Sequence, residues 1–245
     1  MNKSVIITGA SGDIGKALCR DFAKAGYNVA IHYNTDEASA LNLQAELESS
    51  YKVKAVPVKA DLRNADEVRA LAEKVLDSFG KIDVLINNAG VCYFSLFQLA
   101  DDNKVRELFE INLMSAMNLT KELLPSMIKN QQGRIINISS MWGIAGASCE
   151  VHYSAAKSAL IGFTKALAKE VGPSGITVNC IAPGYIDTKM NSCIDKDSAN
   201  EIVDCTPMCR VGLPEDISPL AVFLAGKDAG FITGQIISVD GGYGI

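Results

Sequence analysis

Short apolar runs alternate with longer segments of helical period, and this order is the feature that most constrains the fold. The apolar runs are rich in Val and Ile, and they predict strands near residues 4–8, 28–33, 53–58, 82–86, 134–138, 176–181 and 235–239. Helices are predicted between them, near residues 13–25, 36–49, 64–79, 101–130, 153–171 and 214–226. Such an alternation gives parallel strands with helices on both faces of the sheet. We therefore predict an α/β, doubly wound fold with a seven-stranded parallel sheet.

The whole chain, residues 1–245, is predicted to form a single domain. Its 245 residues fit one α/β domain, and no repeat, low-complexity tract or linker interrupts the order of elements. The segment 188–212 is less regular and follows the sixth predicted strand. A lid over a substrate would lie at such a place, so we expect one there.

Charge and hydropathy argue against several classes of partner. The formal net charge is -5, whereas nucleic acids and membrane surfaces attract basic proteins, so neither is expected as a partner. No run approaches the ~20 apolar residues that span a bilayer. The apolar stretch after Met1 is also too short for a signal peptide. We therefore expect a cytoplasmic protein.

The cysteines and histidines do not suggest a metal site. The seven cysteines are odd in number and scattered, and none stands in a Cys-x-x-Cys pair. Only two histidines, His32 and His152, are present. We expect most of the thiols to be small buried hydrophobic groups, and we predict no bound metal.

A glycine-rich turn follows the first predicted strand and leads into the first predicted helix. It reads Thr-Gly-Ala-Ser-Gly-Asp-Ile-Gly over residues 8–15. Glycines at such a turn let the backbone approach a pyrophosphate, whose charge then faces the free N–H groups of the helix N-terminus. Ordinary turns also use glycine. The position directly after the first strand favours a dinucleotide site of the Rossmann type.

Three more polar turns follow later strands. They are Asp61-Leu62, Asn87-Asn88-Ala89-Gly90 and Pro183-Gly184. Each alone is explained by the turn preference of Asn, Asp, Pro and Gly. In open α/β sheets, however, ligands bind beyond the carboxyl ends of the strands, so these turns should converge on one crevice.

The end of the second strand bears on the choice of nicotinamide cofactor. An acidic side chain there would bind the ribose 2′-OH of NAD and repel a 2′-phosphate. The strand ends His32-Tyr33-Asn34-Thr35, and the first acid is Asp36. This favours NADP(H). No arginine stands at Gly12 or at the strand end to hold the phosphate, so NAD(H) stays open.

Chemistry-bearing residues follow the fifth strand. Ser140 comes at its end, and Tyr153 and Lys157 are four residues apart at the start of the next helix, on one face. A phenol titrates near ~10 in water, and a nearby ammonium group should lower that pKa toward the operating pH. Ser140 could then hydrogen-bond the substrate oxygen. A Tyr-x-x-x-Lys pair on a solvated helix surface is the alternative.

These motifs resemble the short-chain dehydrogenase/reductase family over essentially the whole chain. Thr8, Gly9 and Gly15 match its glycine-rich motif, residues 87–90 match its Asn-Asn-Ala-Gly, and Ser140 stands at the family's spacing from Tyr153. The resemblance implies a catalytic set of Asn112, Ser140, Tyr153 and Lys157. The implied cofactor-binding residues are Gly9, Ser11, Asp13, Ile14, Gly15, Tyr33, Asn34, Asp61, Leu62, Asn88, Ala89, Gly90, Tyr153, Lys157, Pro183, Gly184, Ile186 and Thr188.

One departure from the family motif is Asp13, which stands where the family has its middle glycine. A carboxylate near a pyrophosphate is unfavourable unless it turns away or bonds backbone donors. We expect it to bond backbone donors, because the neighbouring Gly12 keeps the turn flexible.

Two branches of the family are similar to this chain. Residues 231–235 and 239–242 resemble the 3-oxoacyl-acyl-carrier-protein reductases, which implies an NADPH-dependent ketoreductase acting on a carrier-protein-bound carbonyl. The loop 142–151 resembles the reductases of a 5-aminopentanone group on a lysine of elongation factor P. A sugar or steroid alcohol dehydrogenase is a third alternative. The family also implies a homodimer or homotetramer that pairs the helices at 101–130 and 153–171.

The loop between Ser140 and Tyr153 faces substrate in this family, which implies substrate contacts for Trp142, Cys149 and Glu150. Loop packing is the alternative for all three, and Glu150 could instead cap the helix that Tyr153 opens. A family member that binds dinucleotide as a sensor or scaffold, without turnover, also stays open. The complete set of four catalytic residues argues against it.

Overall fold

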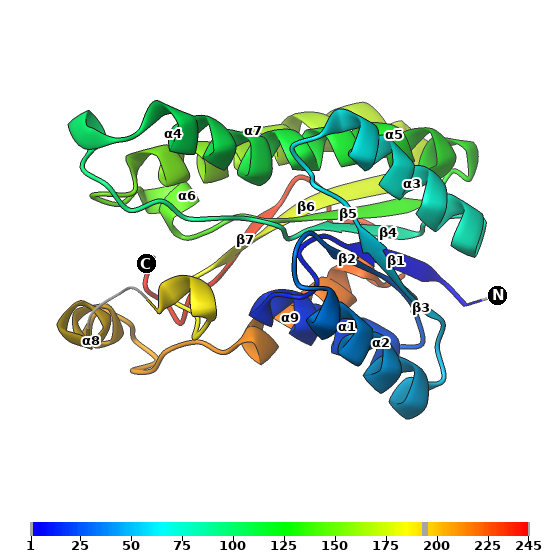
Figure 1. The fold of residues 1–245 in the computed structure, drawn as a ribbon, viewed down its shortest axis with the longest axis horizontal. Helices are drawn as coiled ribbons and strands as arrows, with labels where there is room; N and C mark the ends of the chain where they lie inside the picture. Colours follow the sequence, from blue (N-terminus) through cyan, green and yellow to red (C-terminus); the bar gives the residue numbers. More distant parts are fainter. Residues whose placement is uncertain (1, 193–195, 245) are drawn as a thin grey trace.

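The computed structural model describes residues 2–192 and 196–244, and it shows a twisted sheet between two layers of helices (Figure 1). Within these residues seven strands form one sheet in the order β3-β2-β1-β4-β5-β6-β7, and all neighbours are parallel. This confirms the predicted fold. The strands are β1 (Ser4–Ile7), β2 (Asn28–Tyr33), β3 (Ala55–Lys59), β4 (Val84–Asn87), β5 (Gly133–Ile138), β6 (Ile176–Pro183) and β7 (Ile236–Val239).

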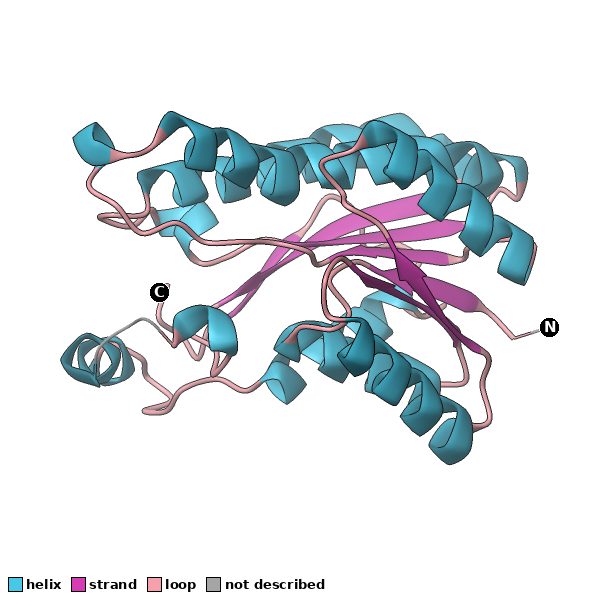
Figure 2. Ribbon diagram, viewed as in Figure 1, coloured by secondary structure: helices cyan, strands magenta, loops and turns pink. Residues whose placement is uncertain are grey.

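Helices connect the strands at the places that the sequence predicts (Figure 2), and the described part of the chain adds two helices that were not predicted, α6 and α8, together with short helical turns. The α-helices are α1 (Asp13–Lys24), α2 (Glu37–Tyr51), α3 (Ala65–Phe79), α4 (Asp102–Phe109), α5 (Ser115–Lys129), α6 (Trp142–Ala145), α7 (Val151–Val171), α8 (Lys196–Asp204) and α9 (Pro214–Ala225). The short helical turns are η1 (Phe97–Leu99), η2 (Glu110–Met114), η3 (Gly172–Ser174) and η4 (Lys189–Asn191).

The sheet separates two hydrophobic clusters, one under each layer of helices. Successive side chains of a strand point to opposite faces, so Val5 and Ile7 of β1 join one cluster while Ile6 joins the other. Helices α1, α2 and α9 cover the first face, and α3, α5 and α7 cover the second (Figure 1). Because both faces are covered, the central strands are mostly apolar, as predicted, but β5 and β6 also bury the polar side chains of Asn137 and Asn179.

The predicted single helix over residues 101–130 is interrupted. Helices α4 and α5 are joined by η2, a π-helical turn that contains Asn112. The Asn112 side chain donates to the Val91 carbonyl at 2.8 Å and to the Leu108 carbonyl at 2.9 Å, and its Oδ1 accepts from the Val91 N–H at 3.2 Å. The bonds to Val91 in a neighbouring loop and to Leu108 in α4 hold the wider turn in place, which a helical period cannot reveal.

The order of the strands reverses between β1 and β4. β2 and β3 lie on one side of β1, whereas β4 through β7 lie on the other. The loops that leave these two strands therefore diverge and open a crevice at their carboxyl ends. The glycine-rich turn after β1 and the Asn-Asn-Ala-Gly turn after β4 border this crevice.

The predicted lid over residues 188–212 contains η4 and α8. Its residues 193–195 lie outside the described part of the chain. Among the described residues, no helix is both long enough and apolar enough to cross a membrane.

Candidate active site

A cavity of about 500 Å³ lies at the carboxyl ends of the central strands. It collects most of the predicted site residues from seven stretches of the chain. Predicted residues that line it are Gly9, Ser11, Asp13, Ile14, Gly15, Asn34, Asp61, Leu62, Asn88, Ala89, Gly90, Ser140, Trp142, Glu150, Tyr153, Lys157, Pro183, Gly184, Ile186 and Thr188. The predicted residues Tyr33, Asn112 and Cys149 are not part of this lining.

Other residues line the same cavity although the sequence did not single them out as site residues. They are Gly12, His32, Thr35, Asp36, Val91, Cys92, Ile111, Ile138, Ser139, Met141, Tyr185, Lys189, Met190, Asn191 and Ile202. Most of them adjoin a predicted residue. Widening each predicted stretch by three residues would have found all of them except Ile202, which reaches the cavity from α8.

The glycine-rich turn is fastened to the turn after β4. The Thr8 hydroxyl accepts the backbone N–H groups of Asn88 and Ala89, both at 2.9 Å. Gly9 has φ +62°, and a Cβ on it would lie only 2.9 Å from the Cα of Ala89. A Cβ on Gly15 would strike the Gly9 carbonyl oxygen. These contacts leave a bare backbone cradle before the N-terminus of α1, and a pyrophosphate fits such a cradle.

His32 supports this turn from below. Its Nδ1 accepts the Gly9 N–H at 3.0 Å, and its Nε2 lies 3.0 Å from the Ala60 carbonyl oxygen. Burial lowers the pKa of the imidazole to about 4, so the ring is neutral and its proton is on Nε2. The place of His32 at the end of the second strand was the only signal for this role in the sequence.

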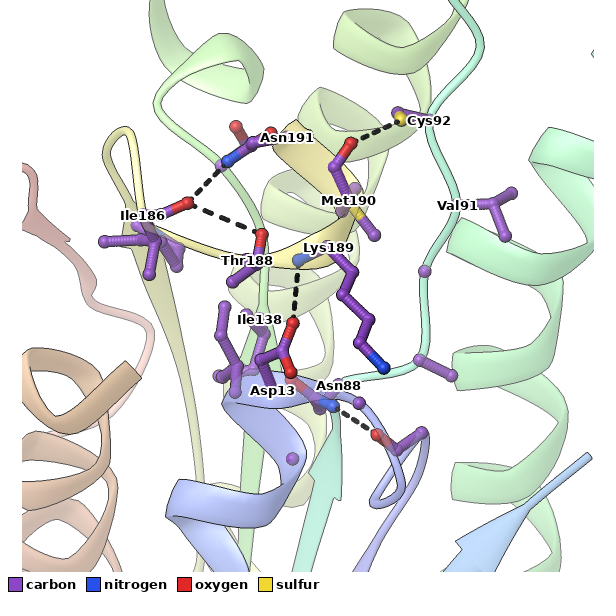
Figure 3. A pocket seen from close by; sticks show the side chains of 18 of the residues that line it. Asp13, Asn88, Val91, Cys92, Ile138, Ile186, Thr188, Lys189, Met190 and Asn191 are labelled. Carbon is purple, nitrogen blue, oxygen red and sulfur yellow. Dashed lines mark hydrogen bonds between the residues drawn. The ribbon is translucent and has the colours of Figure 1, made fainter. Parts of the chain in front are cut away.

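Asp13 bonds a backbone donor, as expected from its place beside Gly12. Its Oδ2 accepts the N–H of Lys189 at 2.8 Å (Figure 3). The bond joins the start of α1 to the segment that follows β6. The carboxylate at the family's glycine position is therefore satisfied by a residue 176 positions away in sequence.

The acids near the end of β2 are engaged elsewhere. Asp36 is the N-cap of α2, and its carboxylate accepts the Ser39 N–H at 3.0 Å. The Tyr33 hydroxyl donates to Glu37 at 2.9 Å. Asn34 is therefore a neutral group of the cavity wall at this strand end, together with Thr35.

The candidate catalytic residues lie on the floor of the cavity. Tyr153, Ser140 and Lys157 are buried, with 8%, 8% and 3% of their surfaces exposed. A side-chain hydrogen bond joins Ser140 to Tyr153. The Lys157 ammonium donates to the Ile138 carbonyl at 2.9 Å and lies 5.7 Å from the centre of the Tyr153 ring. The three groups that the spacing predicted therefore meet.

Asn112 lies behind this floor. A Cβ on Gly90 would lie 2.7 Å from the Asn112 Oδ1 and 3.2 Å from the Lys157 Nζ, so a larger residue there would displace these side chains. Asn112 faces the interior and not the solvent, because its side chain is 1% exposed and bonds the loop at Val91.

The pKa of Tyr153 differs from the sequence-based expectation. Burial is the largest influence and raises the pKa of the phenol, while the hydrogen bond with Ser140 lowers it. The expectation that the nearby lysine brings this pKa below its ordinary value is therefore wrong for this structure. Burial also lowers the pKa of Lys157, to about 8, since desolvation disfavours its charged form. The phenol thus holds its proton at neutral pH.

The substrate loop brings two of its three predicted residues to the cavity. Trp142 packs near Tyr153, and its ring contacts that of Tyr243 edge to face at 5.6 Å. Glu150 is half-buried at the start of α7, and its carboxylate forms no capping hydrogen bond with that helix. Burial raises the pKa of Glu150. Cys149 has φ +62° and meets the neighbouring loop through its carbonyl, which accepts the Ser95 N–H at 2.8 Å.

Comparisons with known proteins agree with this arrangement. A family model described as short chain dehydrogenase matches residues 3–199. An uncharacterized oxidoreductase of Bacillus subtilis (strain 168) is 42% identical over 99% of both chains. The 3-oxoacyl-[acyl-carrier-protein] reductase of Chlamydia muridarum is 40% identical over 99% of this chain and 97% of its own. A solved mutant of a Serratia marcescens short-chain dehydrogenase/reductase superposes with a TM-score of 0.93 at 30% identity, covering 99% and 98% of the two chains.

Proposed function

Since the chain belongs to the short-chain dehydrogenase/reductase family, we propose that it reduces a ketone to a secondary alcohol with NADPH. It is an NAD(P)-dependent oxidoreductase of carbonyl or alcohol groups. One observation carries the proposal of ketone reduction: a protonated phenol, Tyr153, meets Ser140 and Lys157 on the floor of a cavity bordered by a glycine cradle. The protonated form is the one that can donate to a carbonyl.

The roles of the residues follow from their positions. When bound, the nicotinamide supplies a hydride. Tyr153 donates its hydroxyl proton to the carbonyl oxygen of the substrate. The Ser140 Oγ accepts the Trp142 N–H at 3.1 Å, so its own proton is on the side of Tyr153. There it can bond the carbonyl oxygen when the substrate is bound beside Tyr153. The Lys157 ammonium stabilises the phenolate once Tyr153 has lost its proton, because opposite charges favour the ionised form.

The structure supports NADPH through the neutral end of β2. Asn34 lines the cavity, while the nearest carboxylate, Asp36, is occupied as a helix cap. We expect the unmodified protein to bind NADPH more tightly than NADH. Asn34→Asp should shift the preference toward NADH by roughly 10-fold, because its carboxylate would repel the 2′-phosphate of NADPH. Two unit charges about 4 Å apart repel each other by ~1 kcal/mol in bulk water and by ~4 kcal/mol near a protein surface.

Isothermal titration of both proteins with both cofactors measures this shift. Asn34→Gln, which keeps the amide, serves as the control and should retain the preference for NADPH. Tighter binding of NADH by the unmodified protein would contradict the assignment.

A second candidate function is reduction of a 5-aminopentanone group on a lysine of elongation factor P. Glu150 favours it, because a half-buried carboxylate in the cavity, without a capping bond, would match the ammonium of such a substrate. The first candidate, reduction of a 3-oxoacyl group on acyl carrier protein, agrees with the activity named for the Chlamydia relative. The loss of NADPH absorbance with an acetoacetyl thioester or an aminopentanone separates the two.

The same assay tests the remaining alternatives. Turnover of a sugar or steroid alcohol, with neither ketone reduced, would favour the third candidate. Tight cofactor binding without turnover of any of these compounds would favour a dinucleotide-binding sensor or scaffold.

We also propose a cytoplasmic homodimer or homotetramer. Met114 and Met117 support it, because each is 37% exposed on the helical segment for which pairing is expected. Sedimentation of the purified protein gives the oligomer size.

A further inference from the structure

The cavity wall carries more negative than positive side chains. Four carboxylates line it, those of Asp13, Asp36, Asp61 and Glu150. Among the described residues of the lining, the only lysines or arginines are Lys157 and Lys189. Lys157 lies on the floor, where its ammonium bonds the Ile138 carbonyl. Lys189 is therefore the basic group left for the rest of the cavity.

Anionic ligands need this positive charge near the glycine-rich turn. A dinucleotide carries two negative charges on its pyrophosphate, and Asp13 adds another at the first position of α1. The N-terminal dipole of a helix offsets part of such a charge, typically by 0.3–1 kcal/mol per charge. A side-chain cation beside the turn would offset more.

Lys189 is placed beside that turn. It is the first residue of η4, and its backbone N–H donates to the Asp13 Oδ2 at 2.8 Å. Figure 3 shows its side chain extending from this anchor past Asp13 toward Asn88. Its charge also contributes to the lowered pKa of Asp36 at the end of β2, after the larger effects of the cap at Ser39 and of the Lys16 ammonium. The ammonium group therefore extends toward the side of the cavity where Asp13 and Asn88 lie.

We propose that the Lys189 ammonium binds the pyrophosphate of the dinucleotide and that Asp13 is the positioning residue for Lys189. The proposal rests on the dinucleotide-dependent function above. It assigns a role to Asp13, which replaces the family's glycine. The negative charge of Asp13 alone would weaken binding of the pyrophosphate, but its bond to Lys189 brings a positive charge to the same place. The proposal also explains how the turn binds an anion although Gly12 provides no basic side chain.

Lys189→Met tests the contact, because it keeps the length of the side chain and removes the charge. The dissociation constants of NADPH and NADH, measured by titration calorimetry, should both rise by roughly 5- to 20-fold, as for a partly exposed charge-assisted hydrogen bond. The effect should shrink with added salt. Lys74→Met makes the same change on an exposed part of α3, outside the cavity lining, and should leave both constants unchanged.

The other possible results of these titrations would each contradict the contact between Lys189 and the pyrophosphate, and they can be told apart. A loss for NADPH alone would place the ammonium on the 2′-phosphate instead of the pyrophosphate. Unchanged constants for both cofactors would show that Lys189 does not contact either group. An unmodified protein that binds neither cofactor would overturn the proposed function together with this inference.

Asp13→Asn and Asp13→Ala test the positioning role. Both remove the negative charge, but only Asn keeps an oxygen that can accept the Lys189 N–H. Asp13→Ala should therefore bind NADPH and NADH about 3- to 10-fold more weakly than Asp13→Asn. Equal affinities of the two variants would show that the bond does not position Lys189. Combining each variant with Lys189→Met should remove the difference between them.

Discussion

Tyr153→Phe is expected to lower kcat for ketone reduction by roughly 10²–10⁴, the usual contribution of a positioned proton donor. The substitution keeps the ring, which packs against Leu108 and Ala156, and removes the hydroxyl alone. The dissociation constant of NADPH should stay close to that of the unmodified protein. Steady-state kinetics and calorimetric titration on the same preparations measure both quantities.

Two further measurements separate proton donation from a structural effect. Tyr51→Phe removes a hydroxyl on α2, outside the cavity lining, and kcat should not change. Thermal melting should show that Tyr153→Phe is folded, because the aromatic packing is retained. If Tyr153→Phe turned over as fast as the unmodified protein, Tyr153 could not be the proton donor.

The presence of the strands and their parallel arrangement could be predicted from the sequence because several rules agree. Apolar runs of four to eight residues between helical periods predict buried parallel strands, and β4 and β6 fit this length. The glycine-rich turn after β1 fixes which strand ends border the crevice. The π-helical turn at Asn112 could not be read, since its side chain bonds Val91, 21 residues away, and no local period reports such a contact.

The sequence could predict which strand ends form the site, but it could not predict where each side chain points. Ser140, Tyr153 and Lys157 meet because a strand end and a helix start at one edge of the sheet bring them together. Cys149 is outside the cavity lining, although it stands next to Glu150 in the loop. The raised pKa of Tyr153 also depends on burial, which is a property of the packed fold.

Lys189 illustrates the same limit. It adjoins Thr188, which the family resemblance implied as a cofactor contact, yet nothing in the sequence shows where its long side chain points. The bond between its backbone and Asp13 spans 176 residues. The unusual acid in the glycine-rich turn was visible in the sequence, but its partner became visible only in the folded chain.

Glu150→Gln is expected to separate substrates by charge. The Glu150 carboxylate is half-buried in the cavity, and burial raises its pKa, so its charged form is poorly solvated there. A substrate ammonium a few carbons from the ketone would offset this cost. Removing the charge should lower kcat/KM for an aminopentanone by about 5- to 150-fold, which corresponds to a partly desolvated pair of ~1–3 kcal/mol.

The comparison needs substrates that differ only in the cation. The alkanone of the same length, without the amine, and an acetoacetyl thioester should both lose less than about threefold in kcat/KM, because neither places a cation at Glu150. Glu73→Gln on α3 makes the same change on an exposed surface and should affect no substrate. The carboxylate of Glu150 also raises the pKa of Tyr153. Its removal therefore changes proton donation to every ketone, and only the difference between substrates reports the cation site.

Glu150 could instead serve the helix that it precedes. It stands at the N-cap position of α7, where a carboxylate favours the helix dipole by typically 0.3–1 kcal/mol even without a capping hydrogen bond. In that case Glu150→Gln should lower the melting temperature and reduce kcat/KM for the aminopentanone and the alkanone by the same factor. A fall in kcat/KM that is confined to the aminopentanone, with an unchanged melting temperature, would not be explained by an interaction of Glu150 with the dipole of α7. Equal losses on the two ketones would therefore exclude a cation site at Glu150 and leave the carrier-protein-bound substrate as the better candidate.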